Sequence, residues 1–445
     1  MHFTRVLSLA LAVAQPGLTH PGMKKVLSEI REISKRSTMP TDSTELIGDL
    51  ATLSDGELTA TGALIKSIIL NQADPESYED NTASADISSP ECKEDTCCIW
   101  SHIADEMHAL FTSPSGRCTK WARFAIRLGF HDAGSWNKSS TNGGADGSIV
   151  LAAEERARGE NGGLVAMIEQ TQAWYTKYHD ELGYDSVTMA DLIQLGANVA
   201  TVTCPLGPRV RTFIGRKDSS LPAPTNLLPS PFASAELLIQ LFAEKTIGSR
   251  GLVALVGAHT TSQQTTVDPQ RALDPQDSTP GVWDTLYYRQ TLSQNPPPRL
   301  FRFQSDLNLA AHDQTSGDFR AFGGRNGQAL WNRDYAREYV RLSLLGVNNI
   351  NDLQECTKVL PQPTRGNGRS RPGSGNSPAA STLPKSDATD SNFGLDSISS
   401  PSNLEWTPPD QNQIDKWLQT VGRSGSNKNV GQMLAAGQTV TKLRE

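Results

Sequence analysis

The sequence predicts a mainly α-helical fold for the central part of this 445-residue chain. Apolar residues recur there at helical spacing in seven segments, and the stretch Ser186-Val-Thr-Met and Ser234 supply hydroxyl groups where two of these segments begin. Long alternating strands are absent from the sequence, as is a G-x-G-x-x-G motif after a strand, so β-structure is expected to be short at most. The expected helices cover residues 99–111, 121–130, 163–179, 188–199, 233–242, 250–257 and 334–345.

Composition divides the chain into four parts. Residues 1–14 are predicted to be a signal peptide, because Arg5 precedes an apolar run that ends in Ala12-Val13-Ala14, a small-residue pattern typical of a secretory cleavage site. Residues 15–91 are interpreted as an N-terminal extension, either a propeptide or an accessory helical segment, because they contain no cysteine and residues 23–69 show helical periodicity.

Residues 92–360 are predicted to form the folded domain, and residues 361–445 a low-complexity tail. The tail opens with a stretch rich in Pro, Gly, Ser and Asn, which is typical of disorder, and only residues 414–421 suggest a short helix. The net charge of −7 and the pI near 5.7 lack the basic character of a nucleic-acid-binding protein. Because no apolar run reaches about eighteen residues, no membrane span is predicted.

The six cysteines indicate disulfides formed in an oxidising compartment. None of them has C-x-x-C spacing, so neither a zinc ribbon nor a thioredoxin-like site is expected. Adjacent Cys97 and Cys98 cannot readily bond to each other, and the bridge made by the distant Cys356 should tie together the two ends of a folded unit. Fifteen pairings remain possible in principle for six cysteines.

Arg127 and His131 would project from one face if residues 121–132 are helical. A guanidinium beside an imidazole suits a histidine that stays neutral and acts as a base, while the arginine stabilises developing negative charge. A surface helix with scattered polar residues is the plain alternative, and these two residues alone do not decide between them.

His259 follows an apolar helical segment, and Gly257 and Ala258 beside it are small enough to admit something large and flat. Neutral imidazole is a common ligand of haem iron, and its second ring nitrogen then usually needs an acceptor. A packed or capping role is nevertheless the commoner one for a histidine in such a place.

Two oxygen-rich patches each follow one of these histidines. The first is Asp132 with residues 143–148, and the second covers residues 277–284. Both offer carboxylate, carbonyl and hydroxyl oxygens of the kind that Ca²⁺ binds, although neither matches an EF-hand loop and such clusters are often only turns.

Together these motifs resemble the plant-type haem peroxidase superfamily, specifically the secreted fungal class II branch that includes lignin and manganese peroxidases. R-x-x-x-H-D, G-A-D-G-S, G-A-H-T and D-S-T-P-G-x-x-D occur in the family's order and spacing between Cys92 and Pro361. The resemblance implies two helical domains that enclose a haem, with a distal half over about residues 92–215 and a proximal half over about residues 216–360.

The resemblance also implies a role for each matching distal residue. His131 would be the distal base, Arg127 the distal arginine, and Phe130 would pack over the haem. Asn161 would hydrogen-bond His131, and Glu155 would support Asn161.

On the proximal side, His259 would ligate the iron of haem b and Asp306 would accept its ring N–H. Two Ca²⁺ ions are implied as well. The ligands of the first would be Asp132, Gly144, Asp146 and Ser148. The ligands of the second would be Thr260, Asp277, Thr279, Val282 and Asp284. The implied disulfides are Cys92–Cys98, Cys97–Cys356 and Cys118–Cys204, without a fourth bridge seen in many class II members, which suggests a looser proximal domain.

The chain differs from lignin and manganese peroxidases at the positions that determine which electron donor these enzymes oxidise. Manganese peroxidases have two Glu and an Asp where this chain has Lys120, Phe124 and Thr265, and lignin and versatile peroxidases have a surface Trp where it has Ala254. Intracellular class I members carry Trp where Phe130 stands.

The resemblance therefore implies a secreted, monomeric enzyme that uses hydrogen peroxide to oxidise phenols or other small aromatics by one-electron steps at the haem edge, in lignin or aromatic compound breakdown. It would bind no nucleic acid and no membrane. Surface Trp136, Trp283 or Tyr287 are candidate electron relays, although packing is the commoner role for such residues.

Two alternatives stay open: a manganese-dependent or lignin-type activity through an atypical site, and a non-catalytic calcium-binding scaffold. Asn137-Lys138-Ser139 is a sequon for N-glycosylation.

Overall fold

The structure, a computed structural model, describes residues 42–79 and 84–364. The signal peptide, most of the low-complexity tail and the helix expected around residues 414–421 lie outside the described residues. The described part is mainly helical, as the sequence predicts. Its α-helices are α2 (Ala60–Ile69), α3 (Pro90–Glu94), α4 (Cys98–Phe111), α5 (Lys120–Ala133), α6 (Ser148–Leu151), α7 (Ala153–Arg156), α8 (Val165–Tyr175), α9 (Met189–Thr203), α10 (Ala235–Ala243), α11 (Ser249–Val256), α12 (Leu286–Leu292), α13 (Gln304–Ala311), α14 (Ser316–Phe322) and α15 (Gly327–Leu342).

Shorter helical turns connect these helices. The 3-10 turns are η1 (Gly48–Ala51), η2 (Asp55–Glu57), η3 (Gly159–Leu164), η5 (Gly257–Thr261), η6 (Pro269–Arg271), η7 (Ile350–Asp352) and η8 (Thr357–Val359), and η4 (Thr176–Glu181) is a π-helical turn. Among the described residues, the strands are limited to two of two residues each, β1 (Phe213–Ile214) and β2 (Gln354–Glu355), which pair antiparallel. No helix within the described ranges is long and apolar enough to cross a membrane.

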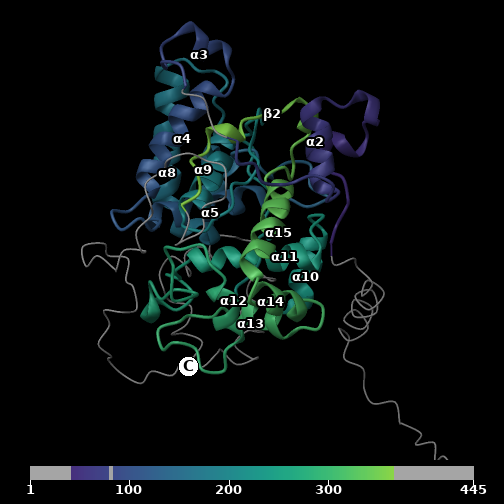
Figure 1. The fold of residues 1–445 in the computed structure, drawn as a ribbon, viewed down its shortest axis with the longest axis vertical. Helices are drawn as coiled ribbons and strands as arrows, with labels where there is room; N and C mark the ends of the chain where they lie inside the picture. The colour runs from purple at the N-terminus through teal and green to yellow at the C-terminus, as the bar shows by residue number, and fades with distance from the viewer. Residues whose placement is uncertain (1–41, 80–83, 365–445) are drawn as a thin grey trace, which may run out of the picture. The chain divides into compact units, whose positions relative to one another are not determined.

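The helices form two groups, with α15 between them (Figure 1). In the first group α4, α5 and α8 pack against α9, and in the second α10 to α14 pack against one another. Helix α15 lies on α11 and α14 of the second group, and the hydroxyl of its Tyr339 donates to Gln194 of α9 at 3.1 Å. Because α15 contacts both groups, it holds the segment that carries His131 and the segment that carries His259 in a defined position relative to each other.

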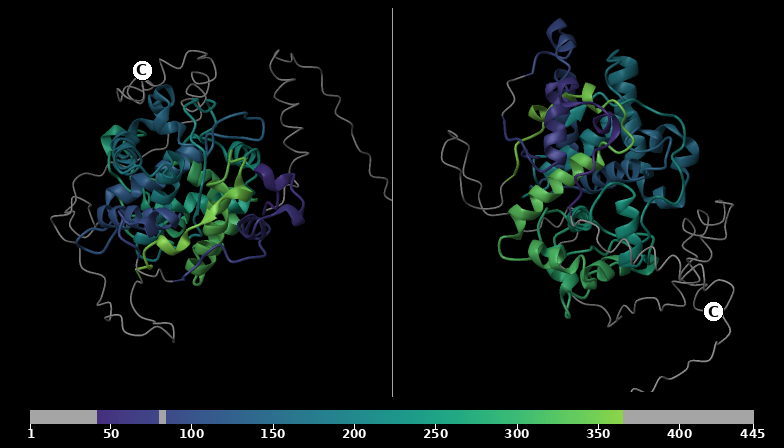
Figure 2. Two further views of the ribbon diagram at one scale, coloured as in Figure 1. Left: turned by 90° about the horizontal axis from the view of Figure 1, so that it is seen from above. Right: turned by 90° about the vertical axis from the view of Figure 1, so that its right-hand side faces the viewer.

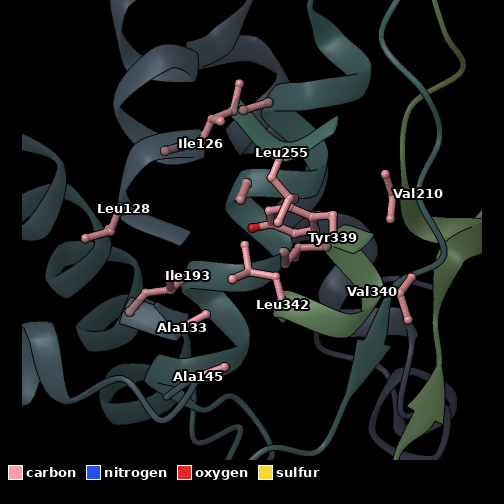
Figure 3. Packing of buried hydrophobic residues seen from close by; sticks show 14 of the residues in the cluster. Ile126, Leu128, Ala133, Ala145, Ile193, Val210, Leu255, Tyr339, Val340 and Leu342 are labelled. Carbon is pink, nitrogen blue, oxygen red and sulfur yellow. The ribbon is translucent and has the colours of Figure 1, made fainter. Parts of the chain in front are cut away.

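Helix α5, which carries His131, packs closely against α9. A Cβ at Gly129 would come within 2.7 Å of the Ala197 Cβ and 2.4 Å of the Tyr339 hydroxyl oxygen. A residue with a side chain at Gly129 would therefore push α5 away from both neighbours. Ile126 of α5 and Ile193 of α9 belong to the buried core around this contact (Figure 3).

Residues 42–79 pack against the C-terminal part of the described chain. The carboxylate of Asp49 accepts hydrogen bonds from the backbone N–H groups of residues 350–351 at 2.9 and 3.1 Å. The buried guanidinium of Arg341 in α15 donates to the backbone oxygen of Ser43 at 2.8 Å, and α2 packs against α15 and η7. The views in Figure 2 show this segment (purple) beside the last helix (light green). Within the predicted extension, these residues are an integral part of the fold.

Three disulfides join the chain, and they are the three pairs that the resemblance implies: Cys92–Cys98, Cys97–Cys356 and Cys118–Cys204. The second of them spans 259 residues and ties the start of α4 to the segment after β2. The bridge of Cys356 joins distant parts of the chain as expected, although residues 42–79 extend the folded unit beyond Cys97.

Candidate active site

Arg127 and His131 lie one turn apart on the same face of α5. The Nε of Arg127 donates to Nε2 of His131 at 3.2 Å, and Nδ1 of His131 lies 2.8 Å from Oδ1 of Asn161. Because the amide oxygen only accepts hydrogen bonds, Nδ1 carries the proton of the neutral ring and Nε2 keeps its lone pair. His131 can therefore take up a proton at Nε2.

The surroundings hold His131 in its neutral form. Burial lowers the pKa of His131, the positive charge of Arg127 lowers it further, and the pKa reaches about 3 even though the hydrogen bond to Asn161 raises it. Burial also lowers the pKa of Arg127, to about 10, so the guanidinium stays charged at neutral pH. A neutral base thus stands beside a fixed cation.

Arg127 is oriented by contacts that the sequence analysis did not anticipate. Its Nη2 donates to the backbone oxygen of Glu160 at 2.8 Å. A Cβ at Gly163 would come within 2.6 Å of Nη1 of Arg127, so only a glycine leaves the guanidinium this position. Both contacts come from η3, and the Gly162-Gly163 pair beside Asn161 is the one sequence signal that could have suggested them.

Asn161 is held by the backbone of Glu155, not by its carboxylate. The Nδ2 of Asn161 donates to the backbone oxygen of Glu155 at 2.9 Å. The carboxylate of Glu155 instead accepts from the backbone N–H of Ala223 at 2.6 Å. Phe130 packs edge-on against His131, with 5.8 Å between ring centroids, and stacks on Phe242.

His259 lies in η5, directly after α11 ends at Val256. Its Nδ1 is 3.0 Å from Oδ2 of Asp306, a buried residue in the first turn of α13. A carboxylate that accepts from Nδ1 leaves the lone pair on Nε2. The side chain of His259 is 32% exposed, whereas that of Asp306 is 1% exposed. An imidazole that is oriented by a carboxylate and has an open face fits the requirements of a haem iron ligand.

The space beside Gly257 is filled by the protein's own aromatic side chains. A Cβ at Gly257 would come within 2.2 Å of the hydroxyl oxygen of Tyr288 and 2.5 Å of Nε1 of Trp331. The expectation that Gly257 makes room for a large flat group is therefore wrong. The glycine is needed for close packing of two aromatic rings, one from α12 and one from α15.

Trp283 and Tyr287 are buried, so a surface position is wrong for both, whereas Trp136 is half-buried. The ring of Tyr287 packs edge-on against His259, with 5.7 Å between centroids. Burial raises the pKa of Tyr287 well above its usual range, and the negative charge of Asp306 raises it further. Tyr287 is thus a neighbour of the proximal pair.

Acidic side chains gather behind His131, at the C-terminal end of α5. The Oδ1 of Asp132 is buried without a hydrogen-bond partner. Burial raises the pKa of Asp132 well above its ordinary range, and the charges of Asp146 and Glu155 raise it further. Ser148, the fourth member of this cluster, interacts with both Asp146 and Glu155. Two buried carboxylates, of Asp132 and Glu155, and the half-buried one of Asp146 lie around this unpaired oxygen. Such a group fits a hard cation such as Ca²⁺, and Glu155 is an addition to the expected ligands.

The loop that supplies this cluster needs its glycines. Gly143, Gly144 and Gly147 have φ values of 83°, 100° and 76°, which is the left-handed region that favours glycine. A Cβ at Gly144 would also come within 2.2 Å of the backbone oxygen of Leu345.

A second oxygen cluster lies beside His259. The hydroxyl of Thr279 lies 2.9 Å from a carboxylate oxygen of Asp284 and 3.3 Å from one of Asp277. Thr260 Oγ1 lies 2.5 Å from Asp277 and 3.4 Å from the backbone oxygen of Val282. Burial raises the pKa of Asp277 well above its ordinary range, with a further contribution from the charge of Asp284. All five predicted residues meet here, and a cation would relieve the repulsion between the two carboxylates.

The positions that bind manganese or relay electrons in related enzymes carry no such groups here. Lys120 is exposed at the start of α5 and Phe124 is half-buried. Thr265 lies near Gly163, with Oγ1 3.9 Å from a Cβ built there. Ala254 is buried in α11, so no surface side chain exists at that position.

Comparisons with known proteins agree with this geometry. The family described as Peroxidase matches residues 103–324, a range that includes both histidines and Asp306. The low-redox potential peroxidase of Taiwanofungus camphoratus is 32% identical over 60% of this chain and 78% of that protein. The peroxidase of Arthromyces ramosus is 29% identical over 61% of this chain and 78% of its own, and ligninase C of Trametes versicolor is 30% identical over 56% and 71%. The chain therefore belongs to the peroxidase family, in its fungal plant-type branch, and is a hydrogen-peroxide-dependent oxidoreductase.

Proposed function

We propose that this protein is a secreted peroxidase that binds haem b at His259 and oxidises phenols or other small aromatic donors at the haem edge. One observation carries the proposal: each of two histidines has its Nδ1 fixed by an acceptor, so that each presents a lone pair at Nε2. The acceptor is the neutral amide of Asn161 at 2.8 Å for His131 and the carboxylate of Asp306 at 3.0 Å for His259. An amide keeps a base weak, whereas a carboxylate strengthens a metal ligand.

When bound, haem supplies the redox chemistry that accepts two oxidising equivalents from peroxide and passes them on singly. On the distal side, Nε2 of His131 takes the proton from the peroxide and returns it to the outer oxygen. Arg127, fixed by Glu160, stabilises the negative charge that develops on that leaving oxygen. Phe130 packs over the distal face beside His131.

On the proximal side, Asp306 holds the proton of His259 Nδ1 and so increases the electron donation from Nε2 to a metal ion. Two Ca²⁺ ions brace the segments that carry the histidines. The first is held by Asp132, Gly144, Asp146 and Ser148, with Glu155 as a further contact. The second is held by Thr260, Asp277, Thr279, Val282 and Asp284.

The donor is proposed to be small and easily oxidised. Lys120, Phe124 and Thr265 provide no carboxylate for Mn²⁺, and Ala254 provides no surface ring. A relative 32% identical to this chain is named a low-redox potential peroxidase, which agrees with modest donors. A part in lignin or aromatic compound breakdown follows from that donor class.

The proposed organisation is a signal peptide at residues 1–14, a domain at residues 92–360 completed by residues 42–79, and a tail from residue 361, in a secreted monomer. Three disulfides among six cysteines support an oxidising compartment.

The test of haem ligation is the absorption spectrum of the purified protein. We expect a Soret band in the wild type that is lost in His259→Ala, because the variant has no axial nitrogen, and that is kept in the matched control His102→Ala. A colourless wild type that still binds calcium would instead support the non-catalytic scaffold.

The test of the donor is steady-state oxidation of a simple phenol by hydrogen peroxide, with and without Mn²⁺. We expect the same rate in both, because no acidic triad is present. A strict requirement for Mn²⁺ would contradict the proposed donor class and indicate an atypical manganese site. Rapid turnover of a non-phenolic, high-potential aromatic would indicate a lignin-type activity.

A further inference from the structure

Asn137 begins the one N-glycosylation sequon of this chain. A sequon is an asparagine followed two residues later by serine or threonine, with any residue except proline between them. Among the 445 residues only Asn137-Lys138-Ser139 meets this definition. The peroxidase chemistry described above uses none of these residues. A glycan is bulky and polar, so the side-chain nitrogen that carries it must reach solvent in the folded protein.

The side-chain amide of Asn137 turns its oxygen to the protein and its nitrogen to the solvent. Oδ1 accepts hydrogen bonds from the backbone N–H of Ser139 at 3.1 Å and from the hydroxyls of Ser139 and Ser140 at 2.9 Å each. Nδ2 donates to no residue that the structure describes, and it is not among the buried polar atoms that lack a partner. The atom that would carry the sugar is therefore the one in contact with solvent.

The loop that contains Asn137 is fixed on both sides of this residue. The backbone oxygen of Trp136 accepts from Nζ of the buried Lys245 at 2.7 Å. The backbone N–H of Lys138 donates to the backbone oxygen of Glu244 at 3.0 Å. Asn137 is half-buried, and the two residues after it are exposed. Because both of its neighbours bind the segment after α10, Asn137 is held in one orientation, with Nδ2 toward solvent.

We propose that Asn137 is N-glycosylated during secretion. This inference rests on the proposed secretion of the protein. The sugar donor is a lipid-linked oligosaccharide pyrophosphate. In the transfer Nδ2 forms a bond to C1 of the first sugar, and the bond between C1 and the pyrophosphate oxygen breaks. The lipid pyrophosphate leaves, one proton of the amide is released, and nothing is oxidised or reduced.

The folded loop can carry the sugar without losing a contact. The transfer replaces one of the two hydrogens on Nδ2, whereas all three hydrogen bonds to the side chain of Asn137 end on Oδ1. The turn that these hydrogen bonds form is therefore the same with and without the sugar. Folding and glycosylation at this position are compatible.

The test is peptide mapping by mass spectrometry of the full chain, collected from the medium of a fungal host that secretes it. Peptide:N-glycosidase in heavy-oxygen water converts a glycosylated asparagine to aspartate with one heavy oxygen. We expect this label at position 137 in more than half of the secreted protein. A digest without the enzyme gives the background from spontaneous deamidation. Asn226, an exposed asparagine followed two residues later by Leu228, is the internal control and should stay unlabelled.

Two hydroxyl variants separate glycosylation from a change in the turn. Ser139→Ala and Ser140→Ala each remove one hydroxyl that lies 2.9 Å from Oδ1 of Asn137, but only the first destroys the sequon. We expect the label to be lost in Ser139→Ala and kept in Ser140→Ala. Ser139→Thr retains a hydroxyl at this position and should keep the label.

An unlabelled Asn137 in the secreted wild type would refute the proposal, as would a label that survives in Ser139→Ala or disappears in Ser140→Ala. None of these results would affect the peroxidase function, which the Soret band of the same sample tests. A wild type that stays inside the cells with Asn137 unmodified would refute secretion and glycosylation together.

Discussion

Lys245 is a buried lysine that the proposed chemistry does not use. Its Nζ donates to the backbone oxygen of Trp136 at 2.7 Å, and it forms no ion pair with any residue that the structure describes. Burial lowers the pKa of Lys245 to about 7. In the unfolded chain the pKa of a lysine is about 10.4. Between these two values the unfolded chain binds more protons than the folded one, so the free energy of unfolding rises with pH in that window and is independent of this group below it.

Lys245→Met should remove that slope. From pH 7 to pH 9 the free energy of unfolding of the wild type should rise by about 2 kcal/mol more than that of the variant, given one proton whose pKa differs between the two states. Denaturant unfolding at both pH values, with disulfides intact, measures the difference. The exposed Lys217→Met is the control and should behave like the wild type. Parallel pH profiles for Lys245→Met and the wild type would show that burial does not lower the pKa of Lys245 in the folded protein.

At the same scale, contacts between residues close together in the sequence could be predicted. Contacts between residues from different elements could not. Arg127 and His131 are four apart on one helix, so their contact follows from helical geometry. The contact between Tyr287 and His259 joins α12 to η5, and the rings that fill the space at Gly257 come from α12 and α15. Nothing local to Gly257 distinguishes room for a ligand from room for a neighbouring side chain.

At the scale of elements, helix boundaries differ from the expected ones where the helical geometry changes or where buried apolar residues are few. The segment expected as one helix over residues 163–179 is divided into η3, α8 and the π-helical η4. Helix α15 begins at Gly327 although its apolar pattern was recognised only from residue 334. In residues 327–333 only Gly327 and Trp331 are buried, so this part of the helix has too few apolar positions to show helical periodicity.

The sequence alone does not decide whether residues 42–79 belong to a propeptide or to an accessory helical segment. Their charged contacts with the rest of the chain predict that they stabilise the fold. Asp49→Ala should lower the free energy of unfolding by about 2 kcal/mol, because two backbone N–H groups would lose a charged acceptor. Thermal or denaturant unfolding measures the loss.

Asp55→Ala is the matched control, because the carboxylate of Asp55 is 86% exposed and only pairs with Lys66 on the surface. It should change the stability little. Equal effects of the two substitutions would mean that the contact of Asp49 with residues 350–351 contributes nothing to folding.

At the scale of the whole molecule, both histidine-bearing segments rest on buried carboxylates that repel one another without a cation. We therefore expect the chelator EDTA to lower the unfolding temperature of the wild type and added Ca²⁺ to raise it. The free energy of unfolding should increase by about 1.4 kcal/mol per site for each tenfold rise in Ca²⁺ concentration above the dissociation constant. Scanning calorimetry measures both effects. In Asp277→Asn one of the two sites is weakened, so the loss on chelation should be smaller than in the wild type.

Asp313→Asn, an exposed acid outside both clusters, should respond to the chelator like the wild type. An unfolding temperature that changes neither with EDTA nor with added Ca²⁺ would contradict both proposed calcium sites.

The Cys97–Cys356 bridge imposes an order on the making of this protein. Its two thiols are separated by 259 residues, so at about 5–20 residues per second the ribosome exposes Cys97 roughly 10–50 seconds before its partner exists. During that interval Cys92 can pair with Cys98, and Cys118 with Cys204, which leaves Cys97 as the unpaired thiol. The last thiol to be synthesised then closes the third bridge, so a chain released after residue 204 but before residue 356 keeps one unpaired cysteine, a chemical mark by which such unfinished copies can be told from finished ones.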